Sequence, residues 1–173
     1  FVDRQTRPGT KLVTQISDID LKVDQASPDS PFNVELKGRA GKAGKQNLLV
    51  KGTVLPDKDG TGSATFDMKI EAADVGFPLV SPYLSSILPF SMEGRNFSAD
   101  LRIYGNTGKE IRGAGKFSVD GVRPTEGKGT RADLKMEVAG EVIYNLQNGK
   151  VTMNPVRMTL GKTELEVSGS VVN

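Results

Sequence analysis

The amino-acid sequence predicts an all-β fold: a large, coiled antiparallel sheet, open like a groove or gutter, with one short helix near 81–89. Residues 64–72 alternate apolar and polar side chains without a break. The same alternation recurs at 19–23, 34–37, 134–138 and 165–168. Successive side chains of a strand point to opposite faces, so each segment has one apolar and one polar face. Gly, Asn and Asp residues between the segments are typical of hairpin turns in an antiparallel meander.

Ten segments have the composition and alternation of strands. In chain order they are 11–24, 32–40, 46–55, 63–73, 96–104, 111–120, 131–138, 141–147, 150–160 and 163–172. Because most of them alternate, the sheet is expected to meet water on one face and to leave an apolar face on the other. Any function is expected on the apolar face.

One segment departs from the strand pattern. Ser81 is a candidate N-cap, Pro82 suits the first position of a helix, and Pro89 ends the segment. One or two isolated helical turns are unstable in water, so this helix is expected to pack on the apolar face as a lid. Apolar side chains spaced four residues apart make the candidate lid residues Tyr83, Leu84, Ile87 and Leu88.

Glycines occupy positions where the alternation requires an apolar side chain. These positions are Gly52, Gly113, Gly115 and Gly169. A glycine within a strand either lets the sheet bend or leaves space for something close to the backbone. Both interpretations, a coiling sheet and room for a ligand chain, remain open at this point. Residues 45–55 also align with 162–172, matching at Lys, Leu, Val, Gly and Val, which favours an internal repeat.

Length and charge exclude several classes of protein. A single domain of 173 residues can bury roughly 70% of its extended surface, which is enough for a core. The 23 Lys and Arg are interleaved with 21 Asp and Glu, giving a net charge of +2. That balance disfavours a nucleic-acid partner and a polybasic membrane-surface binder. No run approaches the 18 apolar residues of a transmembrane helix.

The residues needed for common active sites are missing or misplaced. The chain contains neither cysteine nor histidine, so it has no disulfide, no ordinary zinc site, no Ser-His-Asp triad and no Cys-His pair. The acidic turn that starts at Asp57 begins like a calcium loop, but Met68 stands where the bidentate glutamate belongs. We therefore expect a non-enzymatic protein with no catalytic residues, no metal and no cofactor.

Five short motifs occur in a characteristic order. They are ISDIDLKV at 16–23, PFNVEL at 31–36, Leu48-x-Val50-x-Gly52-x-Val54, PYL at 82–84 and Leu165-x-Val167-x-Gly169-x-Val171. With these motifs the chain resembles the AsmA family of Gram-negative envelope proteins. The resemblance covers nearly the whole chain and rests on the order of the motifs, because each motif alone is an alternating strand.

The resemblance implies a location and a role. Members of the family are periplasmic, tethered to the inner membrane by an N-terminal helix, and associated with outer-membrane biogenesis. They resemble bridge-like lipid transfer proteins, whose curled sheet carries phospholipid acyl chains along an apolar groove. We expect residues 1–173 to be one AsmA-like β-rich domain and a fragment of a longer chain, because the sequence begins without Met and stops beside a strand pattern.

Two functions follow from these expectations. The first is a lipid-transport module whose apolar groove binds an acyl chain. The alternative is a structural or protein-interaction β-sandwich with a closed core and no ligand. The groove candidates are Leu21, Leu36, Val50, Gly52, Phe66, Met68, Ile70, Leu101, Ile103, Phe117, Leu134, Met136, Val167 and Gly169. Segment 163–172 has no proline and is expected to be an edge strand that associates with a second copy.

Overall fold

A computed structural model of the chain describes residues 2–3, 12–13, 15–24, 30–41, 44–58, 62–84, 92–124 and 133–172. Within these ranges it has one 10-stranded sheet and a separate two-stranded sheet. All strand pairings in them are antiparallel. The predicted all-β class is confirmed.

Nearly all of the described elements are strands. The first strands are β1 (Val2–Asp3), β2 (Leu12–Val13), β3 (Ile16–Asp24), β4 (Phe32–Ala40), β5 (Leu48–Pro56) and β6 (Ala64–Gly76). A 3₁₀ turn, η1 (Phe77–Leu79), and one helical turn, α1 (Ser81–Leu84), come next. The remaining strands are β7 (Met92–Glu93), β8 (Asn96–Asn106), β9 (Glu110–Pro124), β10 (Leu134–Asn145), β11 (Lys150–Leu160) and β12 (Thr163–Val172).

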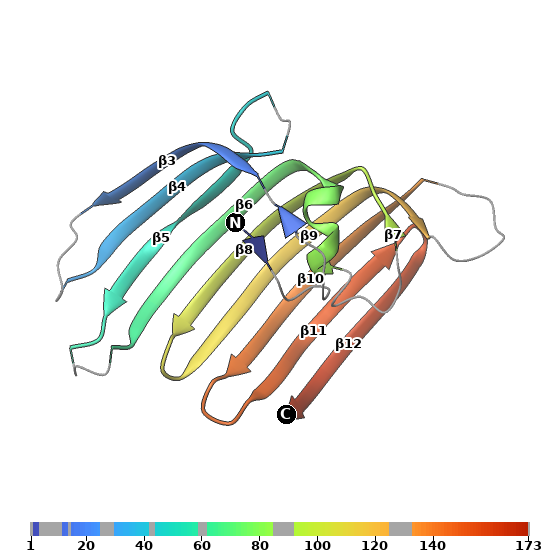
Figure 1. Cartoon of the computed structure of the whole chain (residues 1–173). Coiled ribbons are helices and arrows are strands. Elements are labelled where there is room, and N and C mark those ends of the chain that lie inside the picture. The colour runs from blue at the N-terminus through green and yellow to red at the C-terminus, as the bar shows by residue number, and fades with distance from the viewer. Residues whose placement is uncertain are drawn as a thin grey trace.

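The large sheet is an open meander (Figure 1). Its strand order is β12-β11-β10-β9-β8-β6-β5-β4-β3, so each long strand pairs with its neighbours in sequence, and β7 pairs with β9 off this path. Strands β3 and β12 form its two edges. Figure 1 shows α1 in front of the sheet, near the ends of β8, β9 and β10.

Two predicted strands have wrong boundaries. The segment predicted at 11–24 contains both β2 and β3, which belong to different sheets. The sequence predicts two strands at 131–138 and 141–147, whereas the structure has the single strand β10 across both. Gly140 lies between them with φ +157° and is paired with Gly115 of β9. Glycine tolerates this conformation, so the chain continues through the interruption in the pattern without turning.

Four β-bulges shift the alternation within long strands. Extra residues are accommodated at Asp18 in β3, Asp74 in β6, Gly121 in β9 and Asn154–Pro155 in β11. Asp18, Asp74 and Gly121 have φ between +51° and +67°, a region that Asp and Gly tolerate better than most residues. Each bulge keeps two apolar residues that are three apart on the same face. These residue pairs are Ile16 and Ile19, Ala72 and Val75, Val119 and Val122, and Met153 and Val156.

The buried core lies at one end of the sheet, under η1. Phe77 is 2% exposed and packs with Val119, Val122 and Met136, which are fully buried. The Phe77 amide donates a hydrogen bond of 2.8 Å to the Arg95 carbonyl, which holds the turn against the start of β8. Partly buried side chains surround the cluster: Val80, Phe97, Phe117, Leu134, Val138, Met158 and Leu160.

Candidate functional site

The strand register places one apolar row across the whole large sheet. Leu21 lies opposite Leu36, Leu36 opposite Val50, Val50 opposite Ile70, and Ile70 opposite Leu101. Directly opposite residues of antiparallel strands point to the same side. The row continues from Leu101 through Gly115, Gly140, Val156 and Val167 to the β12 edge. We call the side of the sheet that carries this row the apolar face.

The other groove candidates lie on the same side. Phe66 and Met68 share the parity of Ile70 in β6, and Ile103 shares that of Leu101 in β8. Gly52 is opposite Met68. The remaining candidates reach the apolar face through β9, β10 and β12: Phe117, Leu134, Met136 and Gly169. The sequence therefore predicted a set of residues that the sheet brings together, and their role in binding stays a prediction.

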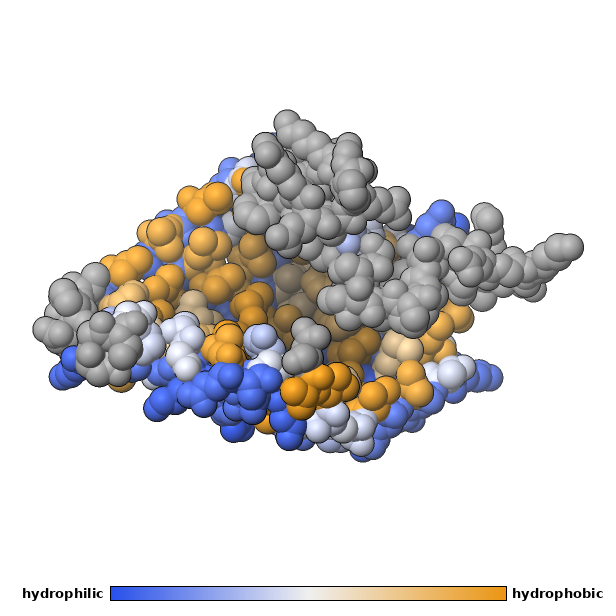
Figure 2. Space-filling model, turned by 60° about the horizontal axis from the view of Figure 1, so that its bottom comes forward, coloured by the Kyte–Doolittle hydropathy of each residue, from blue (hydrophilic) through white to orange (hydrophobic). Residues whose placement is uncertain are grey.

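The apolar face is covered at one end and exposed elsewhere. At the covered end, Ala40 and Val75 are 7% and 5% exposed, and the η1 cluster lies beside them. A methyl group of Leu79 lies near Gly41, so η1 reaches from β9 and β10 across to the end of β4. Toward the opposite, open end and along both edge strands, large apolar side chains are 38–61% exposed: Ile16, Ile19, Leu21, Val23, Val142, Tyr144, Leu165, Val167 and Val171. Figure 2 shows apolar residues gathered over this hollowed face and hydrophilic residues along its lower rim.

The predicted lid is only partly within the described residues. Tyr83 and Leu84 belong to α1, so a helical turn does begin at Ser81. Ile87 and Leu88 lie outside the residues that the structure describes. Phe77, which packs on the apolar face at its covered end, precedes the predicted lid and follows the bulge in β6.

Glycines allow neighbouring strands to come close together. A Cβ at Gly52 would collide with the carbonyl oxygen of Asp67, and one at Gly115 with that of Asp100. At Gly140 a Cβ would lie 2.7 Å from the carbonyl oxygen of Pro155. In these three cases the obstacle is the backbone of the adjacent strand. This geometry supports the first interpretation of the glycines, in which they let the sheet coil. Gly113 and Gly169 differ, since a Cβ at either position would meet no atom within 4 Å.

The polar face carries paired charges. Arg102 donates two hydrogen bonds to Asp67, which lowers the pKa of that carboxyl group. The Asn154 amide and the Tyr104 hydroxyl donate to Glu141 at 3.1 and 2.8 Å and lower its pKa. These groups remain ionised in water, whereas a general acid needs a raised pKa.

A hollow of about 700 Å³ on the polar face is lined by both acidic and basic residues. Its lining includes the basic residues Lys51, Lys69 and Arg102. Lys69 forms ion pairs with Glu71 and Asp100, and Arg102 forms one with Asp67. The hollow therefore has no field of a single sign that would attract one class of ion.

Sequence reasoning missed the most deeply buried part of the apolar face. Val75, Phe77, Val119 and Val122 were not among the candidates. The bulges displace Val75 and Val122 from the simple alternation, and Phe77 lies in the turn beyond β6, whereas Val119 follows the alternation of Phe117 and could have been included. A usable signal was present at the two bulges. Two apolar residues three apart enclose Asp, Gly or Pro, as in Ala72–Val75 and Val119–Val122.

The chain exposes more surface than a compact protein of its size. Its accessible surface is 11540 Å². A compact monomer of 18.5 kDa is expected to expose about 8,200 Å². Folding therefore buries about 57% of the extended surface, less than the roughly 70% that the length allows.

No protein-family model matches the chain, and no curated protein or solved structure matches it either. In the part of the chain that the structure describes, no helix is both long and apolar enough to cross a membrane.

Proposed function

We propose that the apolar face binds the acyl chain of a lipid, and that the protein is a non-enzymatic lipid-transport module of the AsmA kind. The observation that carries this proposal is the apolar row across nine paired strands, which is exposed at Leu21 and Val167 on the two edges and half-buried between them. Soluble monomers rarely leave such a continuous apolar surface in water without a binding role.

The apolar face offers what an acyl chain needs. Burying one methylene is worth roughly 0.8 kcal/mol, so a chain of ~16 carbons gains on the order of 10 kcal/mol when it leaves water. This gain requires contact with apolar side chains and no specific polar partner. The row supplies such side chains at about 4.8 Å per strand, except at Gly115 and Gly140. A site of this kind needs no catalytic residue and no metal ligand. It therefore also explains why the sequence contains no recognisable catalytic or metal-binding motif.

The proposal extends to location and cellular role. By its resemblance to the AsmA family, the protein would act in the periplasm of a Gram-negative cell, in a longer chain anchored to the inner membrane, and would carry phospholipid toward the outer membrane. The closed β-sandwich alternative needs a second apolar layer over the sheet. Exposures of 58% at Leu21 and 43% at Tyr144 favour the open groove over that alternative.

The first test is binding of a fluorescent fatty acid to the purified chain, comparing the wild type with Phe66→Asp. Phe66 lies on the half-exposed part of the apolar face, near its open end. A charge there should oppose an acyl chain and lower the affinity at least about 10-fold, because an unpaired carboxylate is costly in an apolar contact. The matched control is Thr65→Asp, one residue away on the exposed polar face, which should bind like the wild type.

Circular dichroism should show that both variants are folded, since neither site is in the buried cluster. Wild-type protein that binds no apolar probe would refute the proposal for this chain. If Phe66→Asp instead unfolds the protein, Phe66 belongs to a closed core and the β-sandwich alternative gains support. Transfer of labelled phospholipid between vesicles, with the same pair of variants, then tests transport separately from binding.

A further inference from the structure

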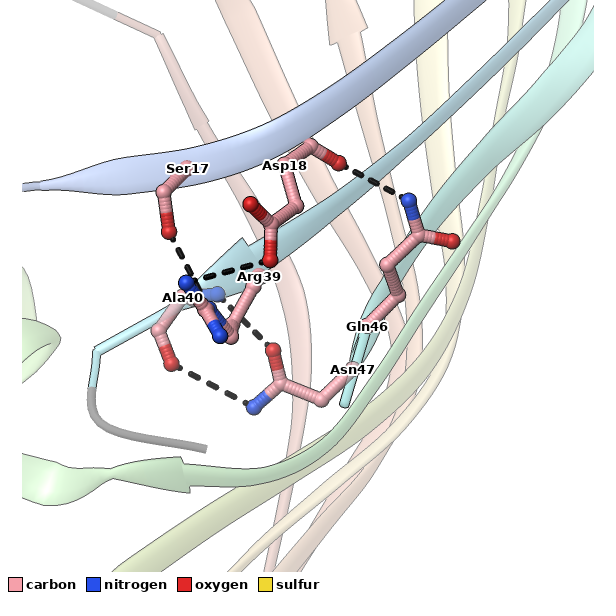
Figure 3. Close-up of polar contacts among 6 residues, drawn as sticks. All are labelled: Ser17, Asp18, Arg39, Ala40, Gln46 and Asn47. Carbon is pink, nitrogen blue, oxygen red and sulfur yellow. Dashed lines mark hydrogen bonds and ion pairs between the residues drawn. The ribbon is translucent and has the colours of Figure 1, made fainter. Parts of the chain in front are cut away.

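Polar side chains at the β3 bulge are engaged in holding the backbone (Figure 3). Arg39 donates a hydrogen bond to the Ser17 hydroxyl at 3.1 Å and forms an ion pair with the Asp18 carboxylate at 3.1 Å. The Gln46 amide donates to the Asp18 carbonyl at 2.8 Å. Guanidinium, carboxylate and amide groups of this kind resist mild oxidants, in contrast to the sulfur of methionine.

Methionine is the only sulfur-containing residue of this chain, which has five methionines and no cysteine. The structure describes the side chains of Met68, Met136, Met153 and Met158, and all of these lie on the apolar face. Met68 and Met136 are groove candidates, and Met153 and Met158 lie opposite apolar-face residues of β10. A reaction at methionine would therefore change the apolar face and leave the polar face as it is.

Two of these methionines belong to the open part of the apolar face. They share one row, in which Met68, Ile103, Gly113, Val142 and Met153 lie opposite one another in turn. Val142 within this row is 38% exposed. Met68 and Met153 are half-buried, so a small oxidant dissolved in water can reach them.

A glycine lies opposite each of these two methionines. Gly52 faces Met68, and the Met68 sulfur lies 2.8 Å from the point that a Cβ of Gly52 would occupy. Gly169 faces Met153, and a Cβ at this glycine would meet no atom within 4 Å. Neither glycine has a side chain that could cover its methionine partner.

The other two methionines lie at the covered end of the apolar face. Met136 is fully buried in the η1 cluster, and Met158 packs against that cluster. Methionine oxidation follows exposure of the sulfur to the oxidant. The fold therefore predicts an order of reaction, with Met68 and Met153 ahead of Met136.

We propose that Met68 and Met153 are sites of oxidation by hydrogen peroxide, and that their oxidation lowers the affinity of the apolar face for an acyl chain. The thioether sulfur attacks one peroxide oxygen, the O–O bond breaks, an S=O bond forms and water leaves. Sulfur loses two electrons and the peroxide gains them. The sulfoxide is polar where the thioether was apolar, so it opposes contact with an acyl chain. The effect on affinity rests on the proposed function, whereas the order of oxidation does not.

Peptide mass spectrometry of the wild-type chain, treated with hydrogen peroxide in the absence of lipid, tests the order of oxidation. Met68 and Met153 should each gain one oxygen, while Met136 should react at least about 10-fold more slowly because burial excludes the oxidant. The same treatment in urea is the control and should oxidise all methionines at similar rates. Equal rates at Met68, Met153 and Met136 in the folded protein would overturn the inference.

Titration with the fluorescent fatty acid, before and after peroxide treatment, tests the effect on the apolar face. Oxidation should weaken wild-type binding by at least about 10-fold, and a methionine sulfoxide reductase should restore it. The double variant Met68→Leu/Met153→Leu should keep after treatment whatever affinity it has before treatment. Met158→Leu is the matched control and should lose affinity on oxidation as the wild type does, because both reactive methionines remain.

Two results would show that oxidation of these methionines does not control binding. One is an unchanged affinity after both sites are oxidised, and the other is an equal loss of affinity in the double variant. Circular dichroism of the oxidised wild type should match that of the untreated protein, since the buried cluster is not oxidised. A wild-type chain that binds no fatty acid before treatment would instead refute the proposed function, and the order of oxidation without lipid would still decide whether Met68 and Met153 are the reactive sites.

Discussion

At the scale of single residues, glycines decide how closely the strands can approach. Gly115 of β9 has φ +137°, and a Cβ there would strike the backbone of Asp100 and Leu101 in β8. Gly113, two residues earlier on the same face, has an ordinary conformation and open space where a Cβ would be. The two glycines look alike in the sequence but have different structural roles.

Gly115→Ala is therefore expected to lower the free energy of unfolding by about 1–3 kcal/mol, because alanine is strained at positive φ and its methyl group would push β8 away. Urea denaturation followed by circular dichroism measures the change. Gly113→Ala is the matched control. It should leave stability unchanged or raise it by up to about 1 kcal/mol, since alanine restricts the unfolded chain. Equal losses in both variants would contradict the assigned roles.

At the scale of elements, bulges and the η1 turn convert a uniform meander into a sheet with two different ends. The bulge at Asp74 turns Val75 back to the apolar face, and the chain then leaves the sheet and inserts Phe77 over β9 and β10. The bulge at Gly121 does the same for Val122. Without these two insertions the side chains of the covered end would point to opposite faces.

Phe77 should contribute more to stability than any aromatic residue on the open part of the apolar face. We expect Phe77→Ala to cost about 3–5 kcal/mol, because it leaves a cavity against fully buried Val119 and Met136. Tyr144→Ala removes a ring of similar size that is 43% exposed and should cost less than about 1 kcal/mol. Thermal and urea unfolding of both variants provide the comparison. A small loss for Phe77→Ala would show that η1 is not the anchor of the covered end.

At the scale of the whole molecule, most of the described residues form one large sheet whose apolar face is shielded at one end by η1. Most of its backbone polar groups are satisfied within the sheet, so the sheet can persist without a second layer on its exposed area. The accessible surface of the chain is 11540 Å².

The exposure of the apolar face should be measurable in solution without any ligand. Because the apolar face is only partly covered, less surface is exposed on unfolding than for a compact domain of the same mass, so the urea m-value should be smaller. The measurement is a two-state urea titration of the wild-type protein. An m-value equal to that of a compact domain of 173 residues would mean that the apolar face is closed in solution.

The sequence by itself determined the class of the fold, the meander and the apolar face. These properties follow from local chemistry, since a backbone with a period of two assigns each side chain of an unbroken segment to a face. For this reason Leu21, Leu36, Val50, Ile70 and Leu101 could be assigned to one side before their strands were paired.

Only the tertiary structure decided where the face is covered and how its strands are joined. Phe77 becomes the central side chain of the core because its turn is held by Arg95, eighteen positions along the chain, and meets β9 and β10. Gly140 continues a strand because β9 and β11 support it on both sides. Such contacts join distant segments, whereas alternation reports only on neighbours. The covered end and the continuous β10 therefore required the assembled sheet.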